Sequence, residues 1–461
     1  MTNYLLVDFG STYTKLTLVD IDKCEILAQT KNITTINEGI MVGYKSALKK
    51  LKEQFKKDIV FEKVLACSSA AGGLKMISIG LSRDLTVEAG KRAALGAGAR
   101  ILKTYSYELS ERDLDEIESL NCDIILLSGG TNGGNYKNIL FNAKKLSSRN
   151  LKIPIVVAGN ENVREEIEEI FEKEKIEYYI TENVMPKVNI LNADPVRNII
   201  REIFMNRIVQ AKGIDTFRDY IDGIFLPTPA AVLKAAELLS KGTKDESGIG
   251  DLIVVDIGGA TTDIHSVSKN KLKDIETRFE GLEEPFAKRT VEGDLGMRYS
   301  AISLYETVGE EKLKSYLKIN SEIYTSCKIR SENIEMVPKS KEEYLFDEAM
   351  AKSAVELAIK RHSGKLRKEY SNGRYIYYQK GKNLRDVLTI IGTGGVIINS
   401  KNPKEILSAV ENNKDSLILT PKTAKYFSDD YYILSAMGLL GMLKPNESIK
   451  IMKKYLKWSC D

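Results

Sequence analysis

The sequence contains 461 residues, which is too many for one ordinary hydrophobic core and predicts two or more domains. Its 68 Lys and Arg residues nearly balance 64 Asp and Glu residues, and the basic runs are interleaved with acidic residues, which argues against a nucleic-acid-binding protein. Scattered cysteines and only two histidines argue against a local zinc or iron–sulfur site, and the lack of an apolar run of about 20 residues predicts a soluble, cytoplasmic protein without a membrane span.

The first predicted element is a hairpin. An apolar strand over Tyr4–Val7 ends at Asp8, and a second strand follows over Leu16–Val19, with a turn rich in glycine and hydroxyl residues between them. This order differs from the strand–loop–helix order of P-loop and Rossmann units. It therefore argues against the commoner nucleotide-binding folds.

Alternating strands and helices predict a small parallel α/β unit between Leu85 and about Gly213. Its clearest strand, Asp123–Leu127, runs into the glycine-rich turn Ser128–Asn135. Open α/β sheets bind ligands at the carboxyl ends of their strands, so this turn is a candidate ligand site. It lacks the GxGxxG pattern and the P-loop lysine, and a tight structural turn is at least as good an interpretation.

The second half of the chain contains another hairpin of the first kind. The segment Val255–Val267 (VDIGGATTDIHSV) repeats the residue order of Val7–Asp20 (VDFGSTYTKLTLVD). Such duplication predicts two similar half-domains that face one another. Between this hairpin and the C-terminus, Glu311–Lys382 is highly charged and helical in character, and a strand over Val387–Ile391 runs into a third glycine turn.

The residues of these turns suit a nucleotide. An aspartate fixed at a strand end can hold a hydrated Mg²⁺, and we expect Asp8 and Asp256 to do so through water. Turn glycines let backbone N–H groups approach phosphate oxygens, hydroxyl residues add donors, and Lys15 adds a positive charge unless it faces solvent. Two ordinary Asp-Gly hairpins are the alternative, which agreement among the three turns disfavours. The residues expected to bind ATP are Gly10, Ser11, Thr12, Tyr13, Thr14, Lys15, Gly258, Gly259, Ala260, Thr261, Thr262, Gly392, Gly394 and Gly395.

These motifs resemble those of the superfamily of actin, sugar kinases and heat-shock ATPases. The resemblance implies an α/β, actin-like ATPase fold in which two duplicated ribonuclease H-like lobes surround a nucleotide cleft. It implies lobe I over 1–84, an inserted parallel α/β subdomain over 85–220, lobe II over 221–430, and a C-terminal helix over 431–461 that returns to lobe I. The matching segments are Asp8–Lys15 and Asp256–Asp263 for the phosphate motifs, Ile391–Val396 for the adenosine motif, and Pro227–Leu233 and Ser435–Leu439 for the connecting helices.

Longer phrases resemble one family within this superfamily. The segments Cys67–Met76 (CSSAAGGLKM), Thr181–Asn192 (TENVMPKVNILN) and Ala287–Ala301 (AKRTVEGDLGMRYSA) are similar to the MutL/GlmL family, which is distinct from the mismatch-repair MutL. The resemblance implies a chaperone that reactivates an adenosylcobalamin-dependent mutase, typically glutamate mutase, by ATP-driven release of damaged cobalamin. ATP and Mg²⁺ are the implied cofactors, and mutase subunits are the implied partners.

One position departs from the superfamily pattern. Chaperones and actins place a Glu or Gln at the start of the first connecting helix to orient the attacking water, and Leu226 stands there in this sequence. Either hydrolysis is slow, or Glu292, Asp294 or Asp263 polarises the water. We favour Asp263 as a catalytic residue beside Asp8 and Asp256, because it lies on the hairpin. His265 faces the same side as Asp263, but a packed histidine is the more frequent case.

Three other functions stay open. A small-molecule kinase needs an aspartate base beside an acceptor hydroxyl, and we find no such segment. A filament-forming actin relative needs self-complementary surfaces, and a hydantoinase-like member needs a further substrate site. The chain has no DxHxxG cobalamin motif, so tight base-off cobalamin binding is not expected.

Overall fold

The computed structural model describes residues 2–10, 13–34, 40–55, 59–69, 74–149, 151–211, 221–222, 225–272, 277–317, 322–371, 373–411 and 415–458. The chain forms two compact units. Unit 1 comprises Met1–Gly72, Asp219–Glu280 and Phe286–Asp461, and unit 2 comprises Gly73–Arg218 and Gly281–Pro285. Among the helices of the described segments, none is both long and apolar enough to cross a membrane.

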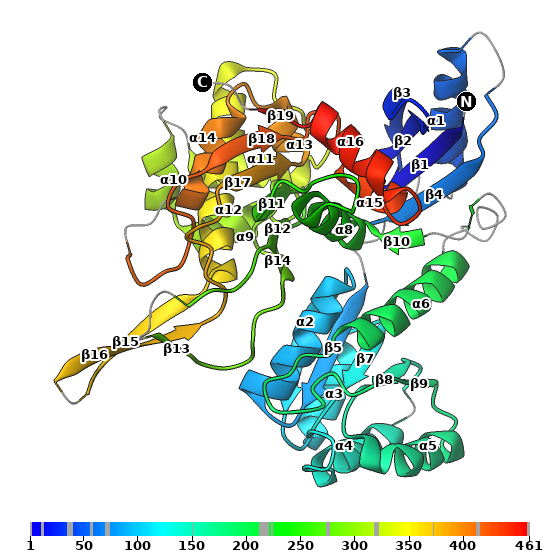
Figure 1. Ribbon diagram of the computed structural model, residues 1–461, viewed down its shortest axis with the longest axis vertical. Coiled ribbons are helices and arrows are strands. Elements are labelled where there is room, and N and C mark those ends of the chain that lie inside the picture. The colour runs from blue at the N-terminus through cyan, green and yellow to red at the C-terminus, as the bar shows by residue number, and fades with distance from the viewer. Residues whose placement is uncertain are drawn as a thin grey trace. The chain divides into compact units, whose positions relative to one another are not determined.

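The first sheet of unit 1 is built on the N-terminal hairpin (Figure 1). β1 (Asn3–Phe9), β2 (Tyr13–Asp20) and β3 (Glu25–Ile33) are antiparallel, and β4 (Lys63–Ser68) and β10 (Phe225–Pro227) continue from β1 in parallel. The resulting order is β10-β4-β1-β2-β3. β1 is buried from Tyr4 to Phe9 because it lies at the centre of this sheet, and α1 (Ile40–Glu53) packs against β2 and β3.

The second sheet of unit 1 repeats this topology. β11 (Leu252–Ile257), β12 (Thr262–Val267) and β14 (Ala287–Glu292) are antiparallel, and β17 (Thr389–Thr393) and β18 (Lys425–Ser428) continue from β11 in parallel. The order β14-β12-β11-β17-β18 matches β3-β2-β1-β4-β10 strand for strand, with β19 (Lys457–Trp458) added at the edge. The predicted duplication is confirmed, and the chain has the actin-like ATPase fold.

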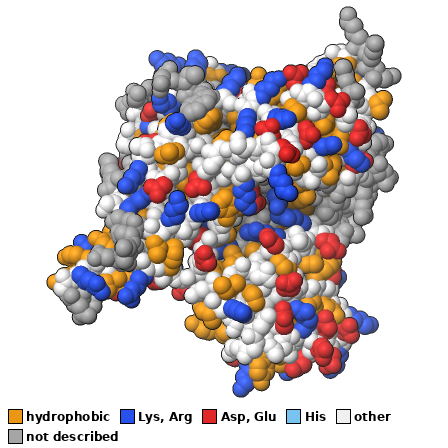
Figure 2. All heavy atoms as spheres, viewed as in Figure 1, with side chains coloured by type: hydrophobic (Ala, Val, Ile, Leu, Met, Phe, Trp, Pro, Cys, Tyr) orange, Lys and Arg blue, Asp and Glu red, His pale blue; other side chains and the backbone are white. Residues whose placement is uncertain are grey.

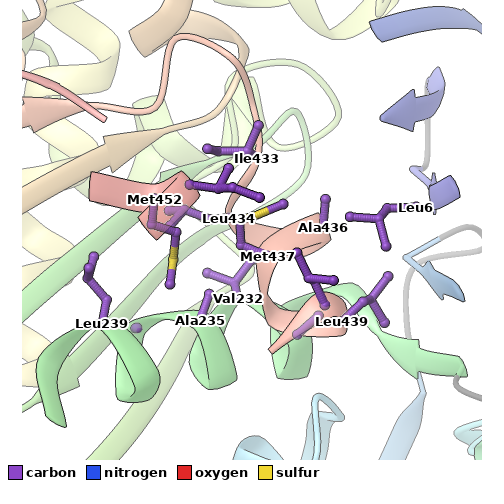
Figure 3. Packing of buried hydrophobic residues seen from close by; sticks show 14 of the residues in the cluster. Leu6, Val232, Ala235, Leu239, Ile433, Leu434, Ala436, Met437, Leu439 and Met452 are labelled. Atoms are coloured by element: carbon purple, nitrogen blue, oxygen red, sulfur yellow. The ribbon is translucent and has the colours of Figure 1, made fainter. Parts of the chain in front are cut away.

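Two helices at equivalent positions join the sheets. α8 (Thr228–Lys241) follows β10, and α15 (Leu434–Leu440) follows β18 after a short connection. With α16 (Pro445–Tyr455), they form a core that includes residues of both sheets, and Figure 3 shows Val232 of α8 close to Leu434 and Met437 of α15. The helices approach most closely at Gly438, where an added Cβ would overlap the carbonyl oxygen of Ala231.

We expect Gly438→Ala to lower the free energy of unfolding by about 2–3 kcal/mol, because the added methyl group meets backbone and forces α8 and α15 apart. Gly395→Ala is the matched control, since a Cβ at Gly395 has no atom within 4 Å. Urea denaturation followed by circular dichroism compares the two variants. Equal midpoints would contradict the close helix contact.

The second sheet separates two cores. Alternate residues of β11 point to opposite faces, so Leu252 and Val254 join the α8–α15 core while Ile253 and Val255 join a second core. The second core is centred on α12 (Lys341–His362), which Ser340 begins with a capping box. The other helices of this part of unit 1 are α9 (Ala301–Val308), α10 (Glu310–Tyr316), α11 (Ile323–Glu332), α13 (Gly395–Asn399) and α14 (Pro403–Leu407).

The charged segment Glu311–Lys382 is helical only in part. β15 (Lys365–Ser371) and β16 (Arg374–Lys380) form an antiparallel hairpin within it, and β13 (Thr277–Phe279) pairs in parallel with β16. The helical interpretation is wrong for this stretch, because β16 is rich in tyrosine, which favours a pleated strand. The hairpin turns at Gly373, whose φ of 79° suits glycine.

Unit 2 is the predicted parallel α/β unit. Its sheet has the order β6-β5-β7-β8-β9. The unit begins at Gly73, ahead of residue 85 expected from the sequence, because β5 is an interior strand that pairs with both β6 and β7. Its strands are β5 (Lys75–Gly80), β6 (Arg100–Ser106), β7 (Ile124–Leu127), β8 (Ile155–Val157) and β9 (Tyr178–Ile180), and its α-helices are α2 (Glu88–Gly96), α3 (Glu111–Ser119), α4 (Lys137–Ser147), α5 (Arg164–Lys173) and α6 (Asp194–Ala211).

The short loop Gly281–Pro285 belongs to unit 2 although β13 and β14 flank it in the sequence. Arg92 of α2 holds it. The guanidinium donates to the carbonyl oxygens of Leu282 and Glu283 at 3.2 and 2.8 Å, and to the carboxylate of Glu284 at 2.8 Å. One arginine, whose side chain is 10% exposed, therefore fixes three successive residues of this loop.

Candidate functional site

The two hairpins of unit 1 have the same geometry. The N–H of Gly10 donates to the carbonyl oxygen of Tyr13 at 3.0 Å, and the N–H of Gly258 donates to that of Thr261 at 2.9 Å. A Cβ at Gly10 would lie 2.7 Å from the Tyr13 oxygen, which explains the glycine. Ser11 and Thr12, predicted to bind phosphate, lie outside the described residues.

The two hairpins carry side chains of opposite charge at one equivalent position, the residue that lies across from the aspartate of the first strand. Asp8 pairs across the first hairpin with Lys15, and Asp256 pairs across the second with Asp263. Directly opposed residues of an antiparallel pair share a face, so each aspartate lies beside its partner. The first hairpin thus carries a cation where the second carries a second carboxylate.

Asp8 is fixed from three other elements. Its Oδ1 accepts hydrogen bonds from Thr228 Oγ1 at 2.8 Å and from Cys67 Sγ at 3.4 Å, and its Oδ2 accepts from Ser435 Oγ at 3.0 Å. The residue is only 5% exposed. Thr228 and Ser435 belong to α8 and α15, so the same helix pair that joins the lobes also orients this carboxylate.

Lys15 lies among carboxylates from both lobes. Burial lowers its pKa, while Asp8, Asp256 and Asp429 oppose that shift. The ammonium lies 3.0 Å from the centroid of the Tyr432 ring, a cation–π contact. Lys15 therefore does not face open solvent, and it brings the first hairpin into electrostatic contact with the second.

Asp429 supports the third turn. Its carboxylate accepts from the amides of Ile433 and Leu434 at 2.8 and 3.1 Å and from Thr393 Oγ1 at 3.1 Å. Burial raises its pKa to about 6. Thr393 lies within the predicted adenosine motif, so Asp429 ties that turn to the start of α15.

The glycines of the third turn have different surroundings. A Cβ at Gly394, whose φ is 102°, would overlap the carbonyl oxygen of Ile257, so this turn lies against the end of β11. Gly392 packs against the Leu407 side chain, which places it in the core, whereas Gly395 has open space beside it. Of the three predicted adenosine contacts, Gly395 is the one with room for a ligand.

The second hairpin is supported by the segment after β14. The amides of Met297 and Arg298 donate to the carbonyl oxygens of Gly258 and Gly259 at 3.1 and 2.8 Å, and Ser300 Oγ donates to that of Ala260 at 2.7 Å. The carbonyl groups of the turn are thereby occupied. The amides of Gly259, Ala260 and Thr261 form no hydrogen bond with another described residue, which fits the binding of an anionic phosphate.

The predicted hydroxyl donors divide into two groups. Thr14 and Thr262 are fully buried, and their hydroxyls bond to Thr34 Oγ1 at 3.1 Å and to the Leu295 carbonyl oxygen at 2.6 Å. Thr261 Oγ1 instead donates to Asp263 Oδ2 at 2.9 Å. Thr14 and Thr262 therefore brace the hairpins from inside, and Thr261 lies at the surface of the turn.

Asp263 is paired with an arginine. Arg289 of β14 contacts Asp263 Oδ1 through Nε and Nη2 at 2.7 and 2.6 Å, and both residues are almost fully buried. With Thr261 on Oδ2, both carboxylate oxygens have partners. Its predicted water-polarising role stays a prediction, and a nucleophilic water would have to share these oxygens.

Two further residues behave as packed groups. Leu226 is 6% exposed in the α8–α15 core, so it cannot orient a water. His265 is fully buried, and burial lowers its pKa to about 3. The imidazole is therefore neutral near pH 7, as expected for a packed histidine.

The pKa of Asp256 is raised to about 7 by burial and by the neighbouring Asp263. A raised carboxyl pKa means that the folded state keeps a proton that the unfolded state loses near pH 4. Stability from this group is thus present below about pH 4 and is lost as pH rises to about 7. Between about pH 5 and pH 7.5 the free energy of unfolding should fall in both proteins, and we expect the fall to be about 1–2 kcal/mol smaller for Asp256→Asn than for the unsubstituted protein. Urea denaturation at the two pH values measures the difference. Parallel pH profiles would contradict this assignment.

The residues present fit a hydrated metal–nucleotide complex. Asp8, Asp256 and Asp429 carry carboxylate oxygens of the kind that Mg²⁺ prefers, and they would meet the ion through the several waters that it usually retains. In the described part of the chain, no group of three or more His, Cys, Asp and Glu side chains is arranged to hold a metal directly. Water-mediated binding, as predicted for Asp8 and Asp256, is the form that this arrangement suits.

The glycine-rich turn Ser128–Asn135 of unit 2 is filled by asparagines. Asn160 Nδ2 donates to the carbonyl oxygens of Gly134 and Asn135 at 3.1 and 3.3 Å. Asn183 Nδ2 donates to the carbonyl oxygen of Gly130 at 3.0 Å. These bonds support the structural interpretation of the turn.

The sequence is similar to known proteins over nearly its whole length. The family model described as MutL protein matches residues 4–456. A MutL protein from Clostridium tetanomorphum is 56% identical over 459 residues, which is 99% of either chain. Among solved structures, gluconate kinase from Lactobacillus acidophilus is 10% identical with a TM-score of 0.37, over 100% of this chain and 93% of the kinase. A diol dehydratase-reactivating factor in nucleotide-free form is also 10% identical with a TM-score of 0.37, over 96% of this chain and 100% of that one.

Proposed function

We propose that this chain, which belongs to the MutL family, binds Mg²⁺-ATP between its two hairpins and uses the nucleotide to change its affinity for a partner enzyme. One observation carries the proposal. Asp8 and Asp256, at the equivalent strand ends of two duplicated sheets, both lie close enough to Lys15 to affect its pKa. A duplicated hairpin that surrounds one cation with carboxylates suits a charged, metal-bound phosphate chain.

Each part of the site has a proposed role. Asp8 and Asp256 would hold the waters of Mg²⁺, which neutralises phosphate charge, and Lys15 would contact a phosphate oxygen. The free amides of Gly259, Ala260 and Thr261 would bind phosphate from the second lobe. Because Leu226 cannot orient a water, ATP turnover would be slow. Slow turnover suits a protein whose conformation follows its bound nucleotide better than it suits a metabolic enzyme.

The helix pair offers a route from nucleotide to partner. Thr228 and Ser435 bind Asp8 directly and belong to α8 and α15, which join the lobes. A change at Asp8 on nucleotide binding would therefore bias the arrangement of the two helices. A ligand shifts such an equilibrium only by its differential affinity for the two states.

The proposed partner is an adenosylcobalamin-dependent mutase of the glutamate mutase type, from which damaged cobalamin would be released. Family membership supports this choice. The test is a pull-down of purified mutase subunits with ATP, with ADP and without nucleotide. We expect capture to differ among the three states. Equal capture of the mutase subunits in all three states, or no capture in any of them, would refute the reactivase proposal.

A further inference from the structure

The small sheet of β13, β16 and β15 has two different faces. In its register Tyr370 lies opposite Tyr375, and Lys368 lies opposite Tyr377. Side chains alternate along a strand, so these four residues share one face, which Phe279 of β13 extends. Tyr370 is 68% exposed, Tyr375 49% and Phe279 48%. We call Phe279, Lys368, Tyr370, Tyr375 and Tyr377 the aromatic face.

A sheet of this size normally buries an apolar face against a helix or another sheet. In Figure 1, β15 and β16 extend away from the helices and the two large sheets of their own unit. Figure 2 shows hydrophobic and basic side chains gathered over this extension. The rings of Tyr370 and Tyr375 meet at 5.1 Å, but such a cross-strand pair contributes only about 0.2–1 kcal/mol and leaves both rings largely exposed. Hairpin stability alone does not account for them.

The hairpin is also basic. β15 and β16 contain five lysine or arginine residues and one glutamate, Glu369, which pairs with Arg367. Among the described residues, neither Lys368 nor Arg374 forms an ion pair, and both are exposed. Of the two, Lys368 lies beside the exposed rings of the aromatic face, and Arg374 lies on the opposite face next to the turn. Their positive charge is complementary to carboxylates on another molecule.

The packing of the rings favours a protein over a nucleic acid. Bases stack on free aromatic faces. The Lys368 ammonium lies 3.6 Å from the centroid of the Tyr375 ring, and the Tyr370 and Tyr375 rings meet edge to face at 62°. Base stacking would have to displace these contacts. Tyrosine and arginine are, in contrast, enriched where protein interfaces concentrate their binding energy.

We infer that the aromatic face docks an acidic surface of a partner protein, with the tyrosine rings packed against it and Lys368 paired with its carboxylates. Arg374 lies next to the turn on the opposite face and adds to the positive charge of the hairpin. The hairpin is thus a recognition arm, separate from the nucleotide hairpins. The inference rests on the proposed function only for the identity of the partner, a mutase subunit.

The test measures the affinity of purified mutase subunits in the presence of Mg²⁺-ATP. Tyr370→Thr/Tyr375→Thr keeps β-favouring residues in the strands, and Lys368→Glu/Arg374→Glu reverses the unpaired charge. We expect each double variant to weaken binding about tenfold or more. Matched controls, Tyr136→Ser/Tyr324→Ser and Lys45→Glu/Lys52→Glu, alter exposed residues elsewhere and should leave the affinity unchanged.

ATP turnover separates this inference from the proposed function. All four variants should turn over ATP like the unsubstituted protein, because none touches the nucleotide site. Unchanged mutase affinity in both hairpin variants overturns the recognition arm and leaves the reactivase standing, whereas no mutase binding by the unsubstituted protein overturns both. Binding of single-stranded RNA that both hairpin variants abolish, without an effect on the mutase, would identify a nucleic-acid surface instead.

Discussion

Asp8→Asn is expected to lower steady-state ATP turnover about 100- to 1000-fold while the protein stays folded. The substitution keeps the shape of the side chain but removes the negative charge that would hold hydrated Mg²⁺. Its new NH₂ group also cannot accept a hydrogen bond from Thr228 or from Ser435. Phosphate release measures turnover, and a fluorescent ATP analogue measures binding.

The control for this variant is Asp386→Asn, which makes the same chemical change at an exposed position. It should leave turnover and binding unchanged. We expect Asp256→Asn to act in the same direction as Asp8→Asn, because Asp256 occupies the equivalent position in the second hairpin. Normal nucleotide binding and turnover in both Asp8→Asn and Asp256→Asn would remove the basis of the site.

Arg289→Met is expected to lower the free energy of unfolding by about 3–5 kcal/mol. Arg289 is 5% exposed and Asp263 6% exposed, so removal of the guanidinium leaves a buried carboxylate without its cation. Asp256 lies opposite Asp263 and adds a second carboxylate beside it. Methionine keeps much of the length of the side chain, so the loss reflects charge more than volume. Urea denaturation at low salt measures it.

The double variant Arg289→Met/Asp263→Asn isolates the charge. It removes both members of the ion pair, and we expect it to recover most of the lost stability, since a neutral pair costs far less to bury. A double variant as unstable as Arg289→Met alone would show that Arg289 acts through other contacts.

The hairpins were predictable because their information is local. Asp8, Gly10 and Lys15 lie within eight residues of one another, and the duplicated segment repeats their order. Strand alternation and turn glycines give such hairpins a recognisable pattern. The same reasoning identified the parallel α/β unit, whose strands and helices alternate in the usual way.

The supports of the site were not predictable, because they come from distant parts of the chain. Thr228 and Ser435 are 220 and 427 residues away from Asp8 in the sequence, and no motif marks either hydroxyl as a hydrogen-bond partner of the Asp8 carboxylate. Arg289 meets Asp263 only through the register of β12 and β14. Asp429 and Tyr432 enter through the connection that precedes α15. The local signals were that Thr228 and Ser435 lie in the two segments similar to connecting helices.

The β15–β16 hairpin was missed for a different reason. Its charged residues favoured the interpretation of a solvated helix. Both faces of this sheet carry polar groups, so the period-2 alternation of apolar residues that indicates a strand is lost. Only the tyrosines favour a strand. A segment that does not bury one face against its own protein gives only a weak pattern.

The loop held by Arg92 limits how this protein can be divided. By sequence, unit 2 resembles a cassette that one could excise between residues 73 and 218 or exchange between relatives. Such an excision would uncover Leu282 and Glu284, which are 5% and 7% exposed, and would leave them in the connection between β13 and β14. Any chimera therefore has to carry Gly281–Pro285 together with α2, as a matched pair from the same parent.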